Sequence, residues 1–176
     1  VNYTHTADLT HESEVAAGIE AAVENLNIIG LNQTAAIGTR VGGLFGSCST
    51  NNCLLDISGV KVRDCILKTA NIYVGENQVA CGAGGLIGVV ATINHATASQ
   101  IEVKYNNILV SENDISGYAA GGLTGINRTA EKECYNIEAQ NIAIRQSNIL
   151  GQGAGGIFGI DLATGKSLAN SYKNIL

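Results

Sequence analysis

Short runs in which apolar and polar residues alternate recur through most of this chain. Residues 101–105 and 142–145 alternate in this way, which is the period of a strand with one buried face. Ile, Val and Tyr fill the apolar positions, and these residues favour half-buried extended backbone. Similar runs bounded by Asn or Gly follow one another from about residue 27 onward. The pattern therefore predicts many short strands.

Residues 10–26 follow a different period. Thr10 is suited to cap a helix, and the first turn after it is acidic. We predict a short helix here, in an N-terminal segment spanning residues 1–26, that caps or decorates the first strands. A helix that docks a partner is the alternative. The apolar residues at helical spacing are Val15, Ile19, Ala22, Val23 and Leu26.

One hexapeptide pattern, small-Gly-Gly-aliphatic-x-Gly, occurs four times, beginning at Val41, Ala83, Ala120 and Ala154. The first glycines of successive blocks are 42, 37 and 34 residues apart, and a recurrence of this size indicates a repeat architecture. Paired glycines permit positive φ or close backbone approach. We expect the aliphatic residue after them to point inward and to stack on its equivalents. This core stack comprises Leu44, Leu86, Leu123 and Ile157.

A run with Asn before aliphatic residues precedes each glycine block, as in Asn71-Ile72 and Asn141-Ile142. Asn tolerates left-handed backbone and suits corners, and stacked Asn amides can form a ladder. A single coil cannot bury its own apolar face, so stacking must supply the core. We predict an all-β fold, a parallel β-solenoid over residues 27–176. Its coils should have roughly 18 residues, two per repeat.

The glycine blocks at 42–46, 84–88, 121–125 and 155–159 resemble the GLUG motif repeats of bacterial surface and secreted proteins. The signature is a glycine pair, Leu, one variable residue and Gly, and Ile157 replaces Leu in the last block. The resemblance covers roughly residues 27–176. It implies a surface-exposed repeat module without a shared catalytic centre, so it transfers no functional residues.

Composition narrows the functional classes. Charged residues make up 14% of the chain, Gly occurs 22 times, and Pro, Met and Trp are absent. The net charge is −5 and the ten basic residues are scattered, so we expect no nucleic-acid partner. No apolar run reaches the roughly 18 residues of a membrane span. Because Met is absent, we expect a mature or trimmed chain, located extracellularly or at the cell surface.

The last residues resemble the middle of a repeat, since Tyr172-Lys173-Asn174-Ile175-Leu176 matches Tyr105-Asn106-Asn107-Ile108-Leu109. We expect either a longer protein or an end covered by another subunit, because open sheet edges invite pairing. The predicted subunit contact comprises Tyr172, Ile175 and Leu176.

The chain has five cysteines. In a secreted protein this number allows two disulfides and one remaining thiol. Cys65 and Cys81 are separated by about one predicted coil and are candidates for a bridge. Cys48 and Cys53 are a second candidate pair, which leaves Cys134 as a free or intermolecular thiol. Five buried, reduced cysteines are the alternative.

Three Asn-x-Ser/Thr triplets are candidates for N-glycosylation, at Asn2, Asn32 and Asn127. Asn127 is the best placed of the three, in a predicted loop directly after a glycine block.

Candidate catalytic residues are sparse. Asp56 and Asp64, or Glu131 and Glu133, do not recur in a way that builds a carboxylate pair, and we interpret them as solvated charges. The glycine blocks lack the Lys-Ser/Thr of a phosphate-binding loop. We expect no cofactor, and no metal site is expected because the cysteine spacings do not fit one. The histidines also lie far from the cysteines in sequence; they are His5, His11 and His95.

These observations favour a structural, non-enzymatic extracellular repeat protein. We expect a subunit or segment of a surface filament that assembles by head-to-tail stacking of solenoid ends. An adhesin that recognises a host protein or glycan through loops on one face is the alternative, and a carbohydrate-active enzyme is a more remote one.

Overall fold

The computed structural model describes residues 19–35, 40–49, 52–70, 81–91, 100–128, 134–161, 166–167 and 170–176. Every regular element in these ranges is a β-strand, and all paired strands run parallel, as in β1 with β6 and β11 with β15. The prediction of an all-β protein with parallel sheets is confirmed. Because the described residues contain no helix, none of them forms one long and apolar enough to cross a membrane.

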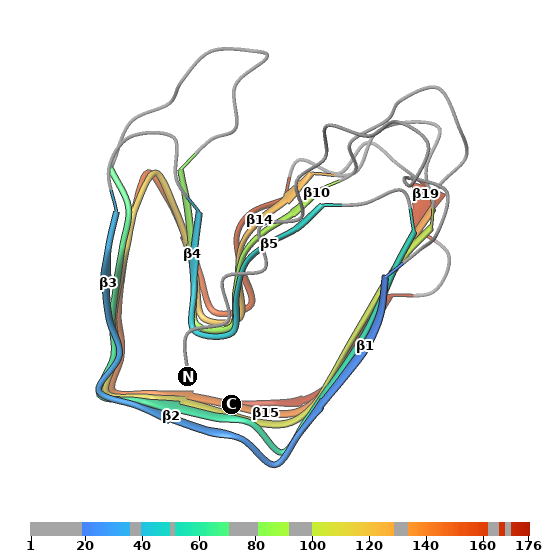
Figure 1. Ribbon diagram of the computed structural model, residues 1–176, viewed down its shortest axis with the longest axis horizontal. Helices are drawn as coiled ribbons and strands as arrows, with labels where there is room; N and C mark the ends of the chain where they lie inside the picture. Colours follow the sequence, from blue (N-terminus) through green and yellow to red (C-terminus); the bar gives the residue numbers. More distant parts are fainter. Residues whose placement is uncertain are drawn as a thin grey trace.

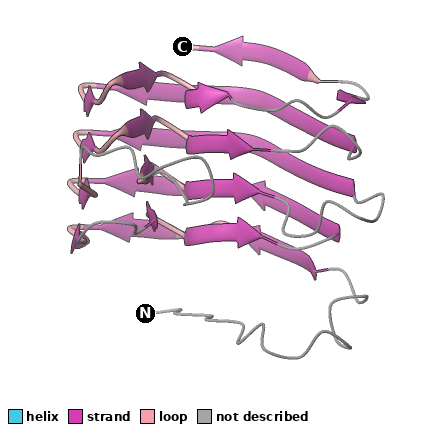
Figure 2. Cartoon of the chain, turned by 90° about the horizontal axis from the view of Figure 1, so that it is seen from above, coloured by secondary structure: helices cyan, strands magenta, loops and turns pink. Residues whose placement is uncertain are grey.

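The chain passes through four sheets in the same order again and again (Figure 1). We call one pass a rung. Rungs 1 to 4 comprise residues 19–49, 52–91, 100–128 and 134–161, and residues 166–176 begin a fifth. The rungs lie one above another, so each strand pairs with its equivalents in the rungs before and after it (Figure 2).

Sheet A has eight strands, and sheets B, C and D have four each. Sheet A comprises β1 (Ile19–Glu24), β2 (Asn27–Ile29), β6 (Asn52–Ser58), β7 (Lys61–Arg63), β11 (Gln100–Ser111), β15 (Cys134–Arg145), β19 (Lys166–Ser167) and β20 (Ser171–Ile175). Sheet B comprises β3 (Asn32–Thr34), β8 (Ile66–Lys68), β12 (Asp114–Ser116) and β16 (Asn148–Leu150). Sheet C comprises β4 (Arg40–Gly42), β9 (Gly82–Gly84), β13 (Ala119–Gly121) and β17 (Gly153–Gly155). Sheet D comprises β5 (Phe45–Ser49), β10 (Ile87–Ala91), β14 (Thr124–Arg128) and β18 (Phe158–Asp161).

One sequence repeat makes one rung. Gly42 pairs with Gly84, Gly84 with Gly121 and Gly121 with Gly155, so each glycine block pairs directly with the next one along the chain. The prediction of two coils per repeat, each about half a repeat long, is therefore wrong. The short runs within a repeat are the successive sides of a single rung, separated by corners, rather than two circuits.

The helix predicted over residues 10–26 is wrong in its described part, because Ile19–Glu24 forms β1. These residues pair in register with Cys53–Ser58 of β6, and Val23 lies opposite the buried Ile57. Val23 fits both a helical and an alternating pattern, and the parallel partner decides in favour of the strand. Residues 10–18 lie outside the described part of the chain.

Sheet A bends at a corner and so forms two sides of each rung. The wall comprises β1, β6, β19 and residues 100–106, 134–140 and 171–173; the base comprises β2, β7 and residues 108–111, 142–145 and 175–176 (Figure 1, where the base runs along the bottom). The bend requires left-handed backbone, which Asn and Gly adopt most readily. All five corner residues have positive φ: Asn25, Gly59, Asn107, Asn141 and Asn174.

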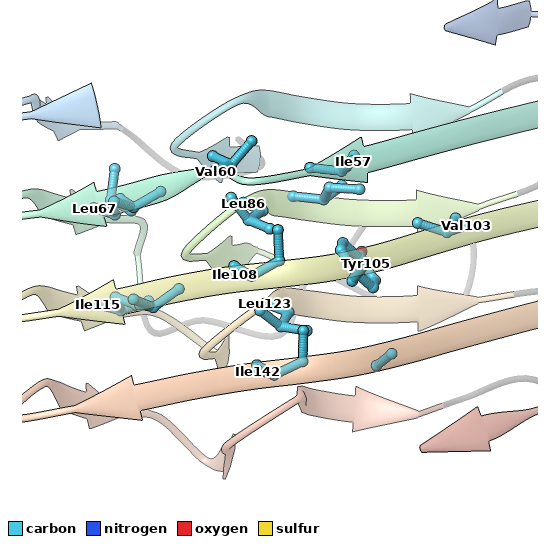
Figure 3. Packing of buried hydrophobic residues seen from close by; sticks show 14 of the residues in the cluster. Ile57, Val60, Leu67, Leu86, Val103, Tyr105, Ile108, Ile115, Leu123 and Ile142 are labelled. Carbon is cyan, nitrogen blue, oxygen red and sulfur yellow. The ribbon is translucent and has the colours of Figure 1, made fainter. Parts of the chain in front are cut away.

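The core lies inside the rungs and is almost wholly aliphatic (Figure 3). The turn between sheets C and D folds inward, toward the base (Figure 1). Leu86 and Leu123 lie in this turn and are fully buried, and Figure 3 shows them beside Ile108 and Ile142 of the base. This inward fold gives each long rung a narrow, filled interior instead of a wide cavity.

Candidate assembly surface

The four glycine-block aliphatics form a continuous stack. The amide N–H of Leu44 donates to the carbonyl of Leu86, Leu86 donates to Leu123, and Leu123 donates to Ile157, at N···O distances of 2.9, 3.0 and 3.2 Å. Leu86 and Leu123 are 0% exposed, whereas Leu44 and Ile157, in the terminal full rungs, are half-buried. The backbone of each rung is thus a template for the next.

We call the turn that each glycine block forms between sheets C and D the glycine corner. In rung 2 this corner, at Gly85, has no room for a side chain. A Cβ on Gly85 would collide with the carbonyl oxygen of Gly122 in the next rung, and it would lie 3.1 Å from Cγ1 of Val110 in the base. The obstacle is mainly backbone, which cannot swing aside. The inward turn therefore requires glycine for space, and its φ is not in the left-handed range.

We call the bend of sheet A between the wall and the base the asparagine corner. Its exposed Asn side chains form a ladder of hydrogen bonds that all run in one direction. Nδ2 of Asn174 donates to Oδ1 of Asn141 at 2.8 Å, and Nδ2 of Asn141 donates to Oδ1 of Asn107 at 3.2 Å. In rung 2, Gly59 takes the equivalent place, and the amide of Asn25 fills the space, since a Cβ on Gly59 would lie 2.5 Å from Asn25 Oδ1. The predicted Asn corners and ladder are present.

The C-terminal end of the described stack is stepped. β20 pairs with β15 in sheet A, beyond rung 4, whereas sheets B, C and D end at β16, β17 and β18. Of the three predicted contact residues, Tyr172 is 44% exposed and Leu176 is 75% exposed. Ile175 is half-buried against the core and pairs with Ile142. Tyr172 and Ile175 thus lie on the strand that forms the raised part of the step, and Leu176 follows directly after it.

A buried polar contact joins the wall to sheet D. The Tyr105 hydroxyl lies 2.7 Å from Oγ1 of Thr124, and the two side chains are 2% and 0% exposed. Burial raises the pKa of Tyr105, although its hydrogen bond to Thr124 acts in the opposite direction. The phenol therefore stays neutral, and the contact is structural. The residue paired with Tyr105 in rung 4 is the small Ala139, which leaves room for the Tyr105 ring, and Tyr172 takes the same position one rung later.

The predicted bridge between Cys65 and Cys81 is not formed, since both residues are reduced, buried thiols. Because one repeat makes one rung, the two residues lie in the same rung, on different sides. The Cys65 thiol donates to the carbonyl of Arg63 at 3.1 Å, as the Ser147 hydroxyl does to Arg145 at 3.0 Å. Burial is the main cause of the raised pKa of Cys65.

The side chains of the other three cysteines lie outside the described part of the structure. Cys48 lies in β5, Cys53 in β6 and Cys134 in β15. The Cys48–Cys53 bridge and the role of Cys134 stay predictions.

The glycosylation sequon at Asn127 is not on a surface loop. Asn127 lies in β14, is 0% exposed, and donates from Nδ2 to Oδ1 of Asp161 at 3.1 Å. Since a glycan would be attached to this same nitrogen, the prediction at Asn127 is wrong for the folded chain. Asn32 is exposed in β3, where Thr34 Oγ1 lies 3.5 Å from its Oδ1, and it stays a candidate. Asn2 lies outside the described residues.

The acidic residues considered for catalysis are separated in space. Asp56 faces outward on the wall, whereas Asp64 lies at the corner between the base and sheet B and pairs with Arg63 at 3.2 Å. Asp64 lines an open depression together with Glu112 and Asp114, and Asp114 pairs with Lys68. Within the described ranges no group of three or more His, Cys, Asp or Glu is placed to hold a metal ion.

Glu131, Glu133 and all three histidines, at positions 5, 11 and 95, lie outside those ranges.

Sequence reasoning missed the charged outer faces of the wall and base. Their residues belong to different repeats and become neighbours only through the register, for example Asp56 with Lys104 and Lys104 with Glu138. The signal that could have revealed them is the charge at equivalent positions of aligned repeats, once one repeat is equated with one rung.

The geometry therefore offers stacked edges and flat outer faces, with nothing that resembles a reaction centre in the described residues. Comparison with family models, with curated proteins and with solved structures finds no match to this chain.

Proposed function

We propose that this chain is a parallel β-solenoid with a structural role, a segment or subunit of an extracellular surface filament. The observation that carries the proposal is that every rung stacks in register on the next. Backbone hydrogen bonds join the rungs at the glycine block, and hydrogen bonds between Asn side chains join them at the asparagine corner. Each rung pairs through backbone hydrogen bonds with the rungs directly before and after it, and a stack of this kind can be extended by adding further rungs.

The asparagine ladder gives the rod a direction. Each described Nδ2 donor belongs to the later rung and each Oδ1 acceptor to the earlier one. In a head-to-tail contact, Asn25 of one copy would donate to Asn174 of the preceding copy, and β1 would pair with β20. At sheets B, C and D, strands of the neighbouring copy would pair with the outer edges of β16, β17 and β18.

Composition and resemblance support the extracellular setting. Charged residues make up only 14% of the chain, and the glycine blocks resemble GLUG repeats of bacterial surface and secreted proteins. A rod with few charges and a dry aliphatic core suits a role in which the protein must persist rather than move or react.

Electron microscopy of the purified protein, with sedimentation over a concentration series, tests the proposal. We expect rods that lengthen with concentration, and shorter rods for Leu176→Asp, which places a charge on the exposed end strand. The matched control is Ile66→Asp, because Ile66 is also partly exposed but lies on the side of rung 2. Single particles at all concentrations, or equal effects of both variants, would count against end-on assembly.

Binding of a host protein or glycan is the second candidate. All connections from sheet D to sheet A leave the same ends of stacked strands, after Ser49, Ala91, Arg128 and Asp161, and the repeats differ in length. Connections of different length therefore begin along one row of strand ends, an arrangement that suits a recognition surface. A glycan and cell-binding screen in which only the D-to-A connections are exchanged distinguishes this role from assembly.

A further inference from the structure

The base presents cations without carboxylates on its described outer positions. Lys61, Arg63 and Arg145 face outward there and are exposed. Arg63 pairs with Asp64 of the adjacent corner, but its side chain stays 51% exposed and accessible to another partner. The remaining outer positions of the base are uncharged: Asn27, Ile29, Leu109, Ser111, Ala143 and Leu176.

The wall presents the opposite charge. Its described outer positions carry four carboxylates and two ammonium groups, which leaves a net charge of −2: Glu24, Asp56, Glu102, Glu138, Lys104 and Lys173. Lys104 Nζ lies 2.7 Å from Glu102 Oε1, and Asp56 and Glu138 lie beside it in adjacent rungs. The hydrogen bond to Glu102 is the main cause of its raised pKa, so Lys104 is charged and compensated within the wall.

The two faces also match in spacing. Arg63 and Arg145 occupy one column of the base, separated by Ser111, and are therefore two rungs apart. Asp56 and Glu138 occupy one column of the wall, separated by Lys104, and are also two rungs apart. Both pairs repeat at about 10 Å, twice the distance between neighbouring strands. Two parallel rods placed side by side could thus align both ion pairs at once.

We propose that the base of one copy docks on the wall of a second copy, with Arg63 and Arg145 opposite Asp56 and Glu138. The contact uses two different faces, so it is heterologous and can add further copies. Because the base and the wall meet at a corner, each added copy is rotated about the rod axis relative to the one before it. It requires no end-on contact and is independent of the filament proposal. Exposed ion pairs are individually weak and are screened by salt, so the association should appear at low ionic strength.

Sedimentation velocity at low and at physiological ionic strength tests the contact. We expect the wild-type chain to self-associate at low salt and to dissociate as salt is added. Arg63→Glu with Arg145→Glu, the base variant, should raise the low-salt dissociation constant by at least about tenfold. Asp56→Lys with Glu138→Lys, the wall variant, should do the same. An equimolar mixture of the two variants should associate again, because the reversed faces are complementary.

The two variants move the net charge in opposite directions, from −5 to −9 for the base variant and from −5 to −1 for the wall variant. General repulsion would therefore favour association of the wall variant, whereas the proposal predicts its loss. Arg145→Glu alone should also weaken association, whereas the same charge change at Lys68 on sheet B, Lys68→Glu, should not. Thermal unfolding verifies that each variant is folded. A wild-type chain that stays monomeric at low salt, or a mixture that fails to associate, would overturn the proposal. Tyr172→Asp alters the exposed end strand without placing a charge on the outer face of the base, because Tyr172 continues the inward column of Tyr105 and Ala139. Persistence of association in this variant separates the lateral contact from the end-on one.

Discussion

The glycine corner and the asparagine corner solve the same problem in different ways. Both turn the chain sharply, and both stack through every full rung. At the glycine corner the limiting quantity is space, since a Cβ on Gly85 meets the backbone of the next rung. At the asparagine corner the limiting quantity is the backbone angle, since Asn107, Asn141 and Asn174 adopt φ of 53, 56 and 52° in an exposed position.

This difference explains what each corner tolerates. The asparagine corner already accepts a substitution, because Gly59 replaces Asn in rung 2 and Asn25 fills the gap. At the buried corner all four blocks keep the glycine pair. A substitution at the corner limited by space should thus cause a large loss in the free energy of unfolding, whereas one at the corner limited by backbone angle should cause a smaller loss.

The largest expected effect is that of Gly85→Ala. Because its Cβ would meet the backbone of Gly122, we expect a loss of about 4 kcal/mol or more in the free energy of unfolding, and little folded protein. Gly30→Ala is the matched control. Gly30 has a φ of +68° but open space around its Cβ, so the change should cost only about 1–2 kcal/mol. Chemical denaturation monitored by circular dichroism measures both, and equal losses would show that space is not what selects glycine.

The Tyr105–Thr124 contact tests how the sheet that follows the glycine corner is fixed to the wall. Tyr105→Phe and Thr124→Val should each cost about 1–2 kcal/mol, because each leaves a buried hydroxyl or its partner unpaired. The double variant should cost less than the sum, since it removes both groups. A double-mutant cycle from denaturation curves that shows strict additivity would mean that the hydrogen bond does not couple the two sheets.

Two substitutions at Asn141 separate the two contributions at the asparagine corner. Asn141→Ala loses both the ladder bonds and the tolerance for positive φ, and we expect a cost of about 1–2 kcal/mol. Asn141→Gly keeps the backbone angle and loses only the ladder, so we expect about half that cost. If the two variants were equally unstable in thermal unfolding, the ladder rather than the backbone would determine the corner.

The smallest expected effect is that of Cys65→Ser. The thiol of Cys65 donates to the carbonyl two residues earlier, and Ser147 makes the same bond two rungs away. A hydroxyl should therefore replace the thiol at a cost of about 1 kcal/mol or less. Thermal unfolding with and without reductant checks this, and a large loss that depends on oxidation would indicate a disulfide after all.

The sequence predicted the residues at the corners better than it predicted how many strands make up one rung. Asn before aliphatic residues indicated the left-handed corners, and the invariant Gly-Gly-aliphatic block indicated an inward stack, because both depend on local backbone chemistry. The number of strands in one rung depends on which run pairs with which, and local pattern does not contain this information. That is why the predicted coil had half the observed length, and why residues 19–24 were expected to be helical.

Asn127 shows the same limit at a single residue. Its sequon and its position after a glycine block suggested a loop, yet β14 continues to Arg128 and places Asn127 beneath Asp161 of the next rung. The outer charged faces were missed for a related reason, since their columns exist only after the register is known. Features set by one residue and its neighbours were thus predictable, and features set by pairing between successive repeats were not.

The most direct test of the account measures which residues are joined by backbone hydrogen bonds. Scalar couplings across hydrogen bonds, observed by nuclear magnetic resonance, connect an amide nitrogen with its acceptor carbonyl. With one rung per repeat, couplings should connect Leu44 to Leu86, Leu86 to Leu123 and Leu123 to Ile157. Couplings from these amides to carbonyls about half a repeat away would contradict the stacking of one rung per repeat.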